Sequence, residues 1–285
     1  MAGVWLMLKA TSQRPPQPAT VPFDGQRALA DVDFQTSLGP RTVGSVAHSQ
    51  TIEWIRAELK DAGWQSEIQN TEMLGHPIQN IIAYRTNIAP KIILGAHYDS
   101  RLFADNDPDP AKRNQPVPGA NDGASGVAVL LELARTLPKQ TPAVWLVFLD
   151  AEDNGRINGW DWILGSRAFV QQNAIKPEAV VIVDMIGDSD LNIYMENNSD
   201  AALSKEIWGQ ASQLGYNQAF IPIPKYTILD DHVPFLDAGI PAVDIIDIDY
   251  PYWHTTADTA DKVSAKSLQI VGDTLWHWIA NKGGK

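Results

Sequence analysis

Residues 148–155, FLDAEDNG, end an apolar run in a cluster of carboxylates. Asp150, Glu152 and Asp153 fall within four positions, and like charges this close repel one another and lose hydration when they are buried. A cation among them, or a proton that one of them transfers, would offset that cost. An acidic, solvated loop after a strand is the plain alternative. The rest of the sequence must decide between the two.

Side chains of the types that bind metals recur after other apolar segments. They are His97, Asp99, Asp122, Glu152, Asp153, Asp184 and, on a loop after the last apolar run, His254. Each alone has an ordinary explanation, such as a core histidine, a helix cap or a turn former. In an open α/β sheet, however, ligands bind at the carboxyl ends of the strands. The recurrence therefore predicts one site at that edge.

The elements that would position these residues alternate between helix and strand. Apolar spacing predicts helices at 49–64, 123–137, 201–214 and 267–280, with shorter ones near 165–172 and 231–239. Strands are predicted at 78–85, 91–97, 143–150, 179–187, 191–195 and 240–246. The alternation predicts a layered α/β architecture.

Composition limits the partners and the chemistry. The 285 residues are 44% hydrophobic and carry a formal net charge of −12, which suits one large core and argues against nucleic acid or an anionic membrane as partner. There is no cysteine, so thiolate nucleophiles, disulfides and thiolate-bound metals are excluded. Any metal must be held by His, Asp or Glu. No apolar run reaches the ~18 residues of a membrane span.

The N-terminus has a short apolar start followed by a Pro-rich polar stretch, MAGVWLMLKATSQRPPQPATVPFDG. This pattern predicts an arm over residues 1–22 that is either the remnant of an export signal with its linker or a flexible segment that is not native to the protein. Export to the periplasm or the outside of the cell is the expectation that follows.

Zinc suits the side chains in question. It takes His nitrogen and carboxylate oxygen, and a catalytic site uses about three protein ligands with one position left open. Two zincs about 3.5–4 Å apart need a bridging carboxylate. Glu152 and Asp153 are adjacent on an extended segment and cannot face one ion equally. One should bind the metal and the other should transfer protons, while Asp150 is expected to be structural and to accept backbone hydrogen bonds.

The ordered motifs resemble those of the zinc aminopeptidases of the co-catalytic type and, within their fold, the glutaminyl cyclases. The motifs are GAHYDS, PGANDGASG, FLDAED, VDMIG, DDHVPFLDAGIP and WHTTADT, within a resemblance that runs from about Phe23 to Trp278. Each is weak alone, but the ordered set is specific. The resemblance implies a zinc exopeptidase fold, with a single three-layer α/β/α domain over residues 23–285 and a mixed, mostly parallel central sheet.

By position, the resemblance implies metal ligands. Asp122, Asp153 and His254 match the ligands of the zinc that both groups hold. His97 and Asp184 match the residues that complete a second zinc site in the aminopeptidases, with Asp122 as the bridge. One zinc is expected, and a second is the open alternative.

The resemblance also implies the residues that support the metal. Glu152 matches the general acid/base, and Asp99 matches the partner that orients the histidine before it. The family usually has Glu where Asp153 stands, and the shorter side chain would require the loop to move closer to the metal. The peptide bond between Asp122 and Gly123 is expected to be cis, as in the family's bridging segment.

Further matches favour the cyclase branch. Asp230 matches a residue of the cyclases' proton network, to which Asp184 would also contribute. Trp253 matches their substrate-pocket tryptophan, and Tyr250 stands where they have a pocket aromatic. Trp160, in GWDWILGSR, lies on the segment that resembles their tryptophan-bearing loop.

Two positions depart from that branch. Asp244 stands where animal cyclases have a histidine, and Leu229 stands where they have a glutamine. Core packing for Trp253 and helix capping for Asp230 are the simpler alternatives.

Two mechanisms could use these parts. A cyclase would have zinc polarise the side-chain carbonyl of an N-terminal glutamine, whose own α-amine attacks while Glu152 carries a proton to the departing ammonia. An aminopeptidase would use Glu152 to activate water and hydrolyse the first peptide bond. Either way the substrate is a peptide or protein with a free N-terminus.

Other classes of protein fit less well. A serine hydrolase would need a G-x-S-x-G elbow, which the sequence lacks. A relative that only binds would be expected to have lost metal ligands, whereas every such position is filled. The segment DNDPDP at 105–110 could hold calcium, but a solvated turn is the expectation because it lacks the longer Gly-bearing ligand loop.

Overall fold

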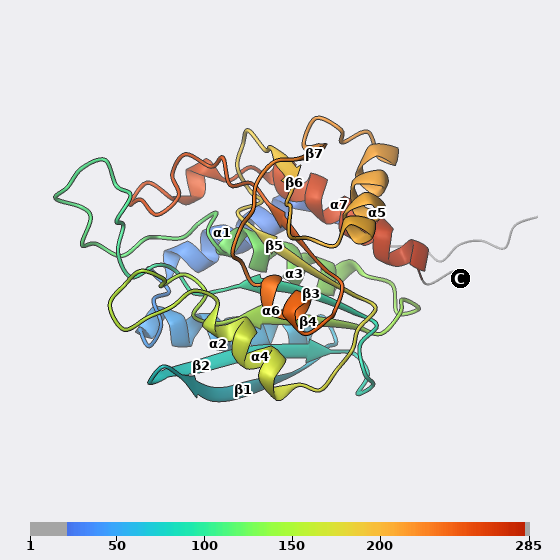
Figure 1. Cartoon of the computed structure of the whole chain (residues 1–285), viewed down its shortest axis with the longest axis horizontal. Helices are drawn as coiled ribbons and strands as arrows, with labels where there is room; N and C mark the ends of the chain where they lie inside the picture. Colours follow the sequence, from blue (N-terminus) through green and yellow to red (C-terminus); the bar gives the residue numbers. More distant parts are fainter. Residues whose placement is uncertain (1–21, 283–285) are drawn as a thin grey trace, which may run out of the picture.

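The computed structural model describes residues 22–282, in which a central sheet lies between two layers of helices (Figure 1). The strands of the sheet are β1 (Gln65–Met73), β2 (His76–Tyr84), β3 (Ile92–His97), β4 (Val144–Leu149), β5 (Ala179–Asp184) and β8 (Ala242–Ile246). Their order is β1-β2-β4-β3-β5-β8. β3 pairs in parallel with β4 and β5, β5 pairs in parallel with β8, and the pairs β1–β2 and β2–β4 are antiparallel. The expected mixed, mostly parallel sheet is confirmed.

The central strands are apolar on both faces because helices cover both. Leu94, Phe148 and Val181 face one core, and their sequence neighbours Val147 and Ile182 face the other. The first core is shared with α1 (Gly25–Ser37), α2 (Val46–Asp61), α3 (Ala124–Thr136), α5 (Ala201–Gln213) and α7 (Ala265–Lys282). The second is shared with α4 (Leu164–Gln172) and α6 (Val233–Asp237). Figure 1 shows α4 and α6 in front of the sheet, with α1 and α3 behind it.

One α-helix and two strands were not predicted. Helix α1 begins after Asp24, whose side chain accepts hydrogen bonds from the backbone N–H of Gln26 and Arg27. Strand β1 has no apolar face, and it forms because it pairs with β2 along its whole length. Strand β7 (Phe220–Pro224) pairs in parallel with the short β6 (Ile193–Met195) outside the main sheet.

Several predicted boundaries differ by two or three residues, and one of these differences concerns a site residue. The strand expected at 179–187 ends at Asp184, because Met185 has a φ of 46° and cannot continue an extended strand. Asp184 is therefore the last residue of β5, and its side chain lies at the sheet edge.

The predicted arm at 1–22 falls almost wholly outside the described residues, and both the arm and its export stay predictions. Among the helices of residues 22–282, none is both long enough and apolar enough to cross a bilayer.

The topology leaves a crevice at the carboxyl ends of the parallel strands. Helix α3 follows β3 and packs on one face of the sheet, whereas α4 follows β4 and packs on the other. The two connections therefore diverge above adjacent strands, which is the position where ligands bind in sheets of this kind.

Candidate metal centre and cavity

Two overlapping groups of metal-type side chains meet at this crevice. One group is Asp122, Asp153 and His254, and the other is His97, Asp122 and Asp184. Within each group, one potential ligand atom from each residue lies within 4.8 Å of the others, and all five side chains are buried. Asp122 belongs to both groups. The structure thus brings together the five residues that the sequence singles out as ligands.

Within each group, the histidine and carboxylate side chains lie at ion-pair distances from one another. Nε2 of His254 lies 2.8 Å from Oδ1 of Asp153 and 3.7 Å from Oδ2 of Asp122. Nε2 of His97 lies 3.1 Å from Oδ1 of Asp122 and 3.1 Å from Oδ1 of Asp184. Asp122 therefore turns one oxygen toward each histidine.

The local backbone allows this approach. His97 and Asp184 are the last residues of β3 and β5, so their side chains project at the sheet edge. The peptide bond between Asp122 and Gly123 is cis, as expected. A Cβ atom on Gly123 would lie 2.5 Å from Nε2 of His97. Only glycine leaves room for the imidazole at this point.

The first group fits a zinc ion. Oδ2 of Asp122, Oδ2 of Asp153 and Nε2 of His254 are buried and form no hydrogen bond with the described residues. The 2.8 Å approach of His254 to Asp153 is an ion-pair distance without hydrogen-bond geometry. Buried polar atoms without partners are costly, unless an ion binds them. One nitrogen and two carboxylate oxygens around one point are a donor set that zinc accepts.

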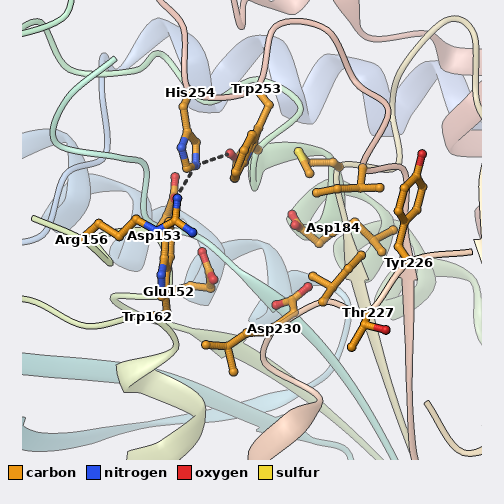
Figure 2. A pocket seen from close by; sticks show the side chains of 16 residues that line it. Glu152, Asp153, Arg156, Trp162, Asp184, Tyr226, Thr227, Asp230, Trp253 and His254 are labelled. Atoms are coloured by element: carbon orange, nitrogen blue, oxygen red, sulfur yellow. Dashed lines mark ion pairs between the residues drawn. The ribbon is translucent and has the colours of Figure 1, made fainter. Parts of the chain in front are cut away.

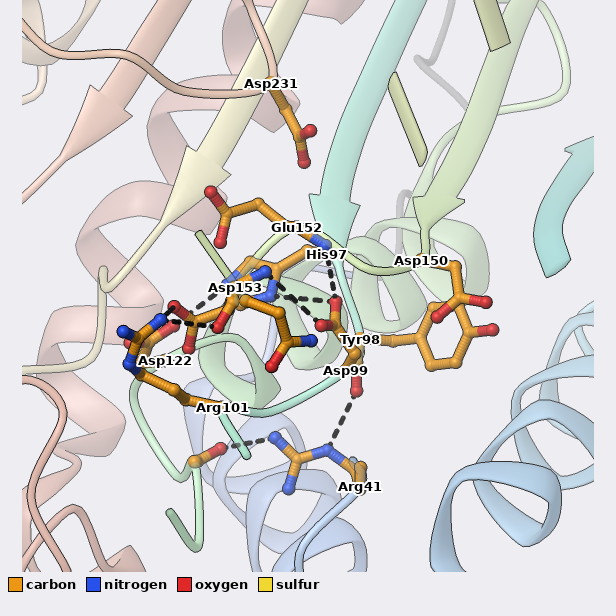
Figure 3. A network of polar contacts seen from close by, with 12 residues as sticks. Arg41, His97, Tyr98, Asp99, Arg101, Asp122, Asp150, Glu152, Asp153 and Asp231 are labelled. Atoms are coloured by element: carbon orange, nitrogen blue, oxygen red, sulfur yellow. Dashed lines mark hydrogen bonds and ion pairs between the residues drawn. The ribbon is translucent and has the colours of Figure 1, made fainter. Parts of the chain in front are cut away.

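Asp99 lies beneath the groups and contacts both of them (Figure 3). Its Oδ1 is 3.5 Å from Nδ1 of His97. Its two oxygens also accept hydrogen bonds from the backbone N–H of Glu152, at 3.1 Å, and of Asp153, at 3.4 Å. Asp99 is placed where an orienting partner of His97 would be.

Arg101 is a buried support that the sequence analysis missed. Its Nη1 donates to the carbonyl oxygen of Asp153 at 2.9 Å, and its Nη2 donates to that of Gly155 at 3.1 Å. Nε and Nη2 also donate to the two oxygens of Asp105, at 2.8 and 2.6 Å. Oδ1 of Asp105 is in turn 3.7 Å from Nδ1 of His254. No spacing in the sequence marks this contact, which depends on how the loops fold.

The turn expected at 105–110 is exposed at five of its six residues, as predicted, but it is also tied to the site. Besides the Arg101 pair, Asp107 is buried and accepts hydrogen bonds from the backbone N–H and the hydroxyl of Thr256, at 2.9 and 2.6 Å. The backbone N–H of Asn106 donates to the carbonyl oxygen of His254. The segment is therefore fastened to the loop that carries His254.

The three carboxylates of FLDAEDNG have three different surroundings. Asp150 points away from the cavity, accepts a hydrogen bond from the backbone N–H of Gln79 at 2.8 Å and lies 2.8 Å from Nε2 of His48. Its structural placement is confirmed. Asp153 joins the metal-type group, and Glu152 lines the cavity beside it.

Burial and neighbouring charge separate the acidities of these groups. Burial raises the pKa of Glu152 well above its usual range, and the charges of Asp153 and Asp230 raise it further. Burial and the charge of Asp122 raise the pKa of Asp153 to about 6. Burial raises the pKa of Asp184 to about 7. A bound cation would act against all three shifts.

Asp122 behaves differently. Burial acts to raise its pKa, but the hydrogen bond and the charge of His97, with the charge of His254, outweigh burial and lower it. The residue shared by both groups is therefore the one held most firmly as a carboxylate.

A cavity of about 350 Å³ opens onto the metal-type cluster (Figure 2). Its lining residues are Asp122, Glu152, Asp153, Arg156, Trp162, Asp184, Met185, Tyr226, Thr227, Ile228, Leu229, Asp230, Ile246, Ile248, Trp253 and His254. The predicted pocket residues Trp253 and Asp230 are among them.

Trp160 and Tyr250 lie outside this lining. Trp160 stacks on His76 with ring centroids 3.5 Å apart, and Trp162 supplies the indole of the cavity wall instead. The hydroxyl of Tyr250 donates to Oδ1 of Asp258 at 2.7 Å. Nothing in the sequence distinguishes Trp160 from Trp162, because both stand on the same loop.

Asp258 is a second support that was missed. Its carboxylate accepts hydrogen bonds from the backbone N–H of Asn121, at 2.8 Å, and of Asp122, at 3.2 Å. It thereby holds the segment that places Asp122 between the two groups. Asp244, noted as a departure from animal cyclases, is buried with Oδ2 3.8 Å from Nδ1 of His232.

The sequence model of peptidase family M28 matches residues 80–279, which include every member of both metal-type groups. The chain belongs to peptidase family M28. It is an enzyme of this family, and its fold is that of zinc exopeptidases.

Solved structures and curated relatives agree with the assignment to this family. The crystal structure of Porphyromonas gingivalis glutaminyl cyclase is similar with a TM-score of 0.87 and 31% identity, over 93% of this chain and 100% of that one. A Zn-dependent exopeptidase from Parabacteroides distasonis is similar with a TM-score of 0.86 and 30% identity, over 92% and 100%. The glutaminyl-peptide cyclotransferase of Boiga dendrophila is 27% identical, over 83% of this chain and 75% of that protein.

Proposed function

We propose that the protein is a zinc-dependent glutaminyl cyclase, which converts the N-terminal glutamine of a peptide or protein to pyroglutamate and releases ammonia. The observation that carries the proposal is the position of Asp230. It lines the same cavity as Glu152 and Asp184, and its charge contributes to the raised pKa values of both. A buried set of interacting carboxyl groups suits a reaction that moves protons without consuming water. The named cyclases among the similar structures support the same choice.

Asp122, Asp153 and His254 would hold the zinc, because each has an unpartnered buried atom and offers a ligand atom within 4.8 Å of those of the other two. Zinc bound there would supply Lewis acidity that polarises the side-chain carbonyl of the substrate glutamine. Every other part of the reaction falls to the protein's own side chains.

Glu152 would move the proton. The α-amine nitrogen of the substrate attacks the side-chain carbonyl carbon, so that a ring C–N bond forms and the bond to the side-chain nitrogen breaks. The amine loses a proton to the carboxylate of Glu152, and Glu152 returns a proton to the departing nitrogen, which leaves as ammonia. Asp230 and Asp184 line the same cavity, and the charge of Asp230 raises the pKa values of both Glu152 and Asp184. These two carboxyl groups would therefore keep the proton near Glu152.

The apolar walls would serve a reaction that must exclude water. The indoles of Trp162 and Trp253 both lie near His254, with ring centroids 5.9 and 3.9 Å from its imidazole. Ile246 and Met185 also line the cavity. A substrate enclosed by these groups would cyclise rather than meet water.

A zinc aminopeptidase is the second candidate. The observation in its favour is the completeness of the second group, since His97, Asp122 and Asp184 also converge, and two metals would suit hydrolysis of the first peptide bond. Glu152 would then activate a water molecule rather than return a proton to ammonia.

One experiment separates the candidates. Purified protein loaded with zinc is incubated with a Gln-initiated and a Leu-initiated peptide, and the products are weighed by mass spectrometry. Loss of ammonia from the first peptide, abolished by a chelator and restored by zinc, is the expected result. Release of the first amino acid from either peptide, without ammonia loss, would instead establish the aminopeptidase.

A further inference from the structure

Arg156 places a positive charge in the wall of an otherwise acidic cavity. Among the lining residues it is the one Arg or Lys, and five carboxyl groups share the cavity with it. Figure 2 shows its side chain reaching into the cavity from the loop after β4, on the same side as Trp162. The wall that carries Tyr226 and Thr227 lies across from it.

The guanidinium of Arg156 is free. Within residues 22–282 it forms no hydrogen bond, ion pair or ring contact. Arg101, which supports the same loop, uses its donors on Asp105, Asp153 and Gly155 and lies 5.0 Å over the Trp162 ring. Arg101 thus provides the hydrogen bonds that hold this loop, and the five N–H donors of Arg156 remain available to a ligand.

The loop that carries Arg156 is held in place. Arg156 has a φ of 64°, which is uncommon for a residue with a side chain. On one side of it Gly155 packs against Trp162, and beyond it His76 stacks on Trp160 and contacts the carbonyl oxygen of Gly159 at 2.9 Å. The loop therefore fixes the point at which the exposed Arg156 side chain leaves the backbone, within reach of the cavity.

The chemistry of that place points to a carboxylate. A guanidinium binds a carboxylate through two parallel hydrogen bonds, and no other common peptide group matches its charge and shape. Three of the five carboxyl groups of the cavity belong to the metal-type groups, so the carboxylate that Arg156 binds would come from the substrate. The protein's net charge of −12 disfavours anionic ligands in general. An isolated cation in the cavity wall would attract a carboxylate locally.

We propose that Arg156 binds a carboxylate on the substrate just after its first residue, and so makes the enzyme prefer peptides that carry one there. The carboxylate is either the side chain of an acidic second residue or the C-terminus of a dipeptide. The inference rests on the proposed function only in that the substrate is a peptide whose first residue occupies the metal end of the cavity.

Paired peptides test the inference. The first pair is Gln-Glu-Ala-amide and Gln-Gln-Ala-amide, and the second is Gln-Ala as the free acid and as the amide. The unmodified enzyme is expected to show a kcat/KM about 5- to 10-fold higher for the carboxylate member of at least one pair, between the effect of an exposed ion pair and that of a buried charged hydrogen bond. The pair that shows the preference identifies the source of the carboxylate.

Variants assign that preference to the residue. In Arg156→Gln the ratio within the pair should fall to about one, and Arg156→Lys should keep part of it because the charge remains without the fork. Arg156→Glu should favour Gln-Lys-Ala-amide over Gln-Glu-Ala-amide. Arg56→Gln removes the same charge from α2, away from the cavity, and should leave the ratio unchanged.

Two outcomes would overturn the inference: equal kcat/KM within both pairs for the unmodified enzyme, or a preference that persists in Arg156→Gln. Failure of the proposed function is a separate result, because the enzyme would then release the first amino acid of the peptide in place of ammonia. In that event the same ratios are measured for hydrolysis of Leu-Glu-Ala-amide and Leu-Gln-Ala-amide. If no peptide is turned over, the dissociation constants of the same pairs decide the question by calorimetry.

Discussion

Asp99 links the position of His97 to that of Glu152. One of its oxygens, Oδ1, lies 3.5 Å from Nδ1 of His97 and accepts the hydrogen bond from the backbone N–H of Glu152 at 3.1 Å. Asp99 is fully buried, so no water replaces these contacts. A single carboxylate therefore contacts a histidine of the second metal-type group and holds the backbone of the residue proposed to move the proton.

Asp99→Ala should accordingly weaken zinc binding and turnover together. Outer partners of metal ligands are typically worth about 10- to 100-fold in metal affinity or activity. Zinc affinity and kcat/KM are measured on the same preparation. Ser100→Ala is the matched control, because the adjacent Ser100 hydroxyl is buried without a hydrogen-bond partner. Normal zinc affinity and turnover in Asp99→Ala would contradict the linking role.

Glu152 and Asp153 should differ in what their loss removes. Glu152→Gln keeps the shape and can still donate and accept hydrogen bonds, but it cannot exchange a proton. We expect zinc to be retained and turnover to fall by ~100-fold or more. Asp153→Asn replaces an anionic ligand with a neutral amide, so zinc binding itself should weaken. Metal content and rate are measured on the same purified variants.

Asp150→Asn supplies the comparison within the same cluster. Asp150 contacts Gln79 and His48 rather than the cavity, so its loss should lower the free energy of unfolding while zinc content stays normal. Equal loss of metal in Glu152→Gln and Asp153→Asn, or full activity in Glu152→Gln, would remove Glu152 from the proposed role.

The parts of the site that could be predicted are those whose position depends on the strands. His97 and Asp184 end apolar strands, and parallel strands bring their carboxyl ends to one edge. Arg101 could not be predicted because its partners are loop carbonyl oxygens, which carry no sequence signal. The exchange of Trp160 for Trp162 has the same origin, since the conformation of their loop decides which indole faces the cavity.

The same distinction applies to the fold. Strands β3, β4, β5 and β8 are buried on both faces. Their sequences are therefore mostly apolar runs, which predict strands clearly. Strand β1 has no apolar face, and its place in the sheet comes from its pairing with β2 along its whole length. Asp24 caps helix α1 and is a residue type typical of helix starts. The apolar residues that follow it are too irregularly spaced to predict the helix.

Gly155 should be required for the position of Trp162. A Cβ atom at this position would lie 2.0 Å from Cδ2 of the indole, a separation that no relaxed structure tolerates. Gly155→Ala should therefore displace the indole from the cavity wall, with a rise in KM and a changed tryptophan emission. A roughly tenfold loss of kcat/KM is expected for a misplaced wall residue.

Gly209→Ala is the control for that substitution. Gly209 lies within α5 and a Cβ atom there would meet nothing within 4 Å. Alanine should stabilise the helix by roughly 0.5–1 kcal/mol and leave KM unchanged. If Gly155→Ala keeps the KM and the emission of the unmodified protein, the indole does not depend on the glycine.

The Glu196 carboxylate should make stability depend on pH in the acid range. Burial acts to raise its pKa, but hydrogen bonds from His232 and from the backbone N–H of Asn198 and Ile228 outweigh burial and lower the pKa to about 2. The unfolded chain would have the ordinary value of 4.5. Because the folded pKa is the lower one, the carboxylate stabilises the fold above pH 4.5 and loses this effect as the pH falls toward 2.

Glu196→Gln should therefore destabilise the protein most at neutral pH. The difference in the free energy of unfolding between the two proteins should be larger at pH 7 than at pH 3, because the unfolded chain takes up the proton first as the pH falls. Urea unfolding of both proteins between pH 7 and pH 3 measures the difference, in which the titration of groups that do not contact Glu196 cancels. Glu178→Gln is the control, since Glu178 is exposed and pairs only with Lys91, at 3.1 Å, and exposed pairs are worth at most about 1 kcal/mol. A difference for Glu196→Gln that stays constant or grows as the pH falls would show that its hydrogen bonds do not hold the carboxylate ionised.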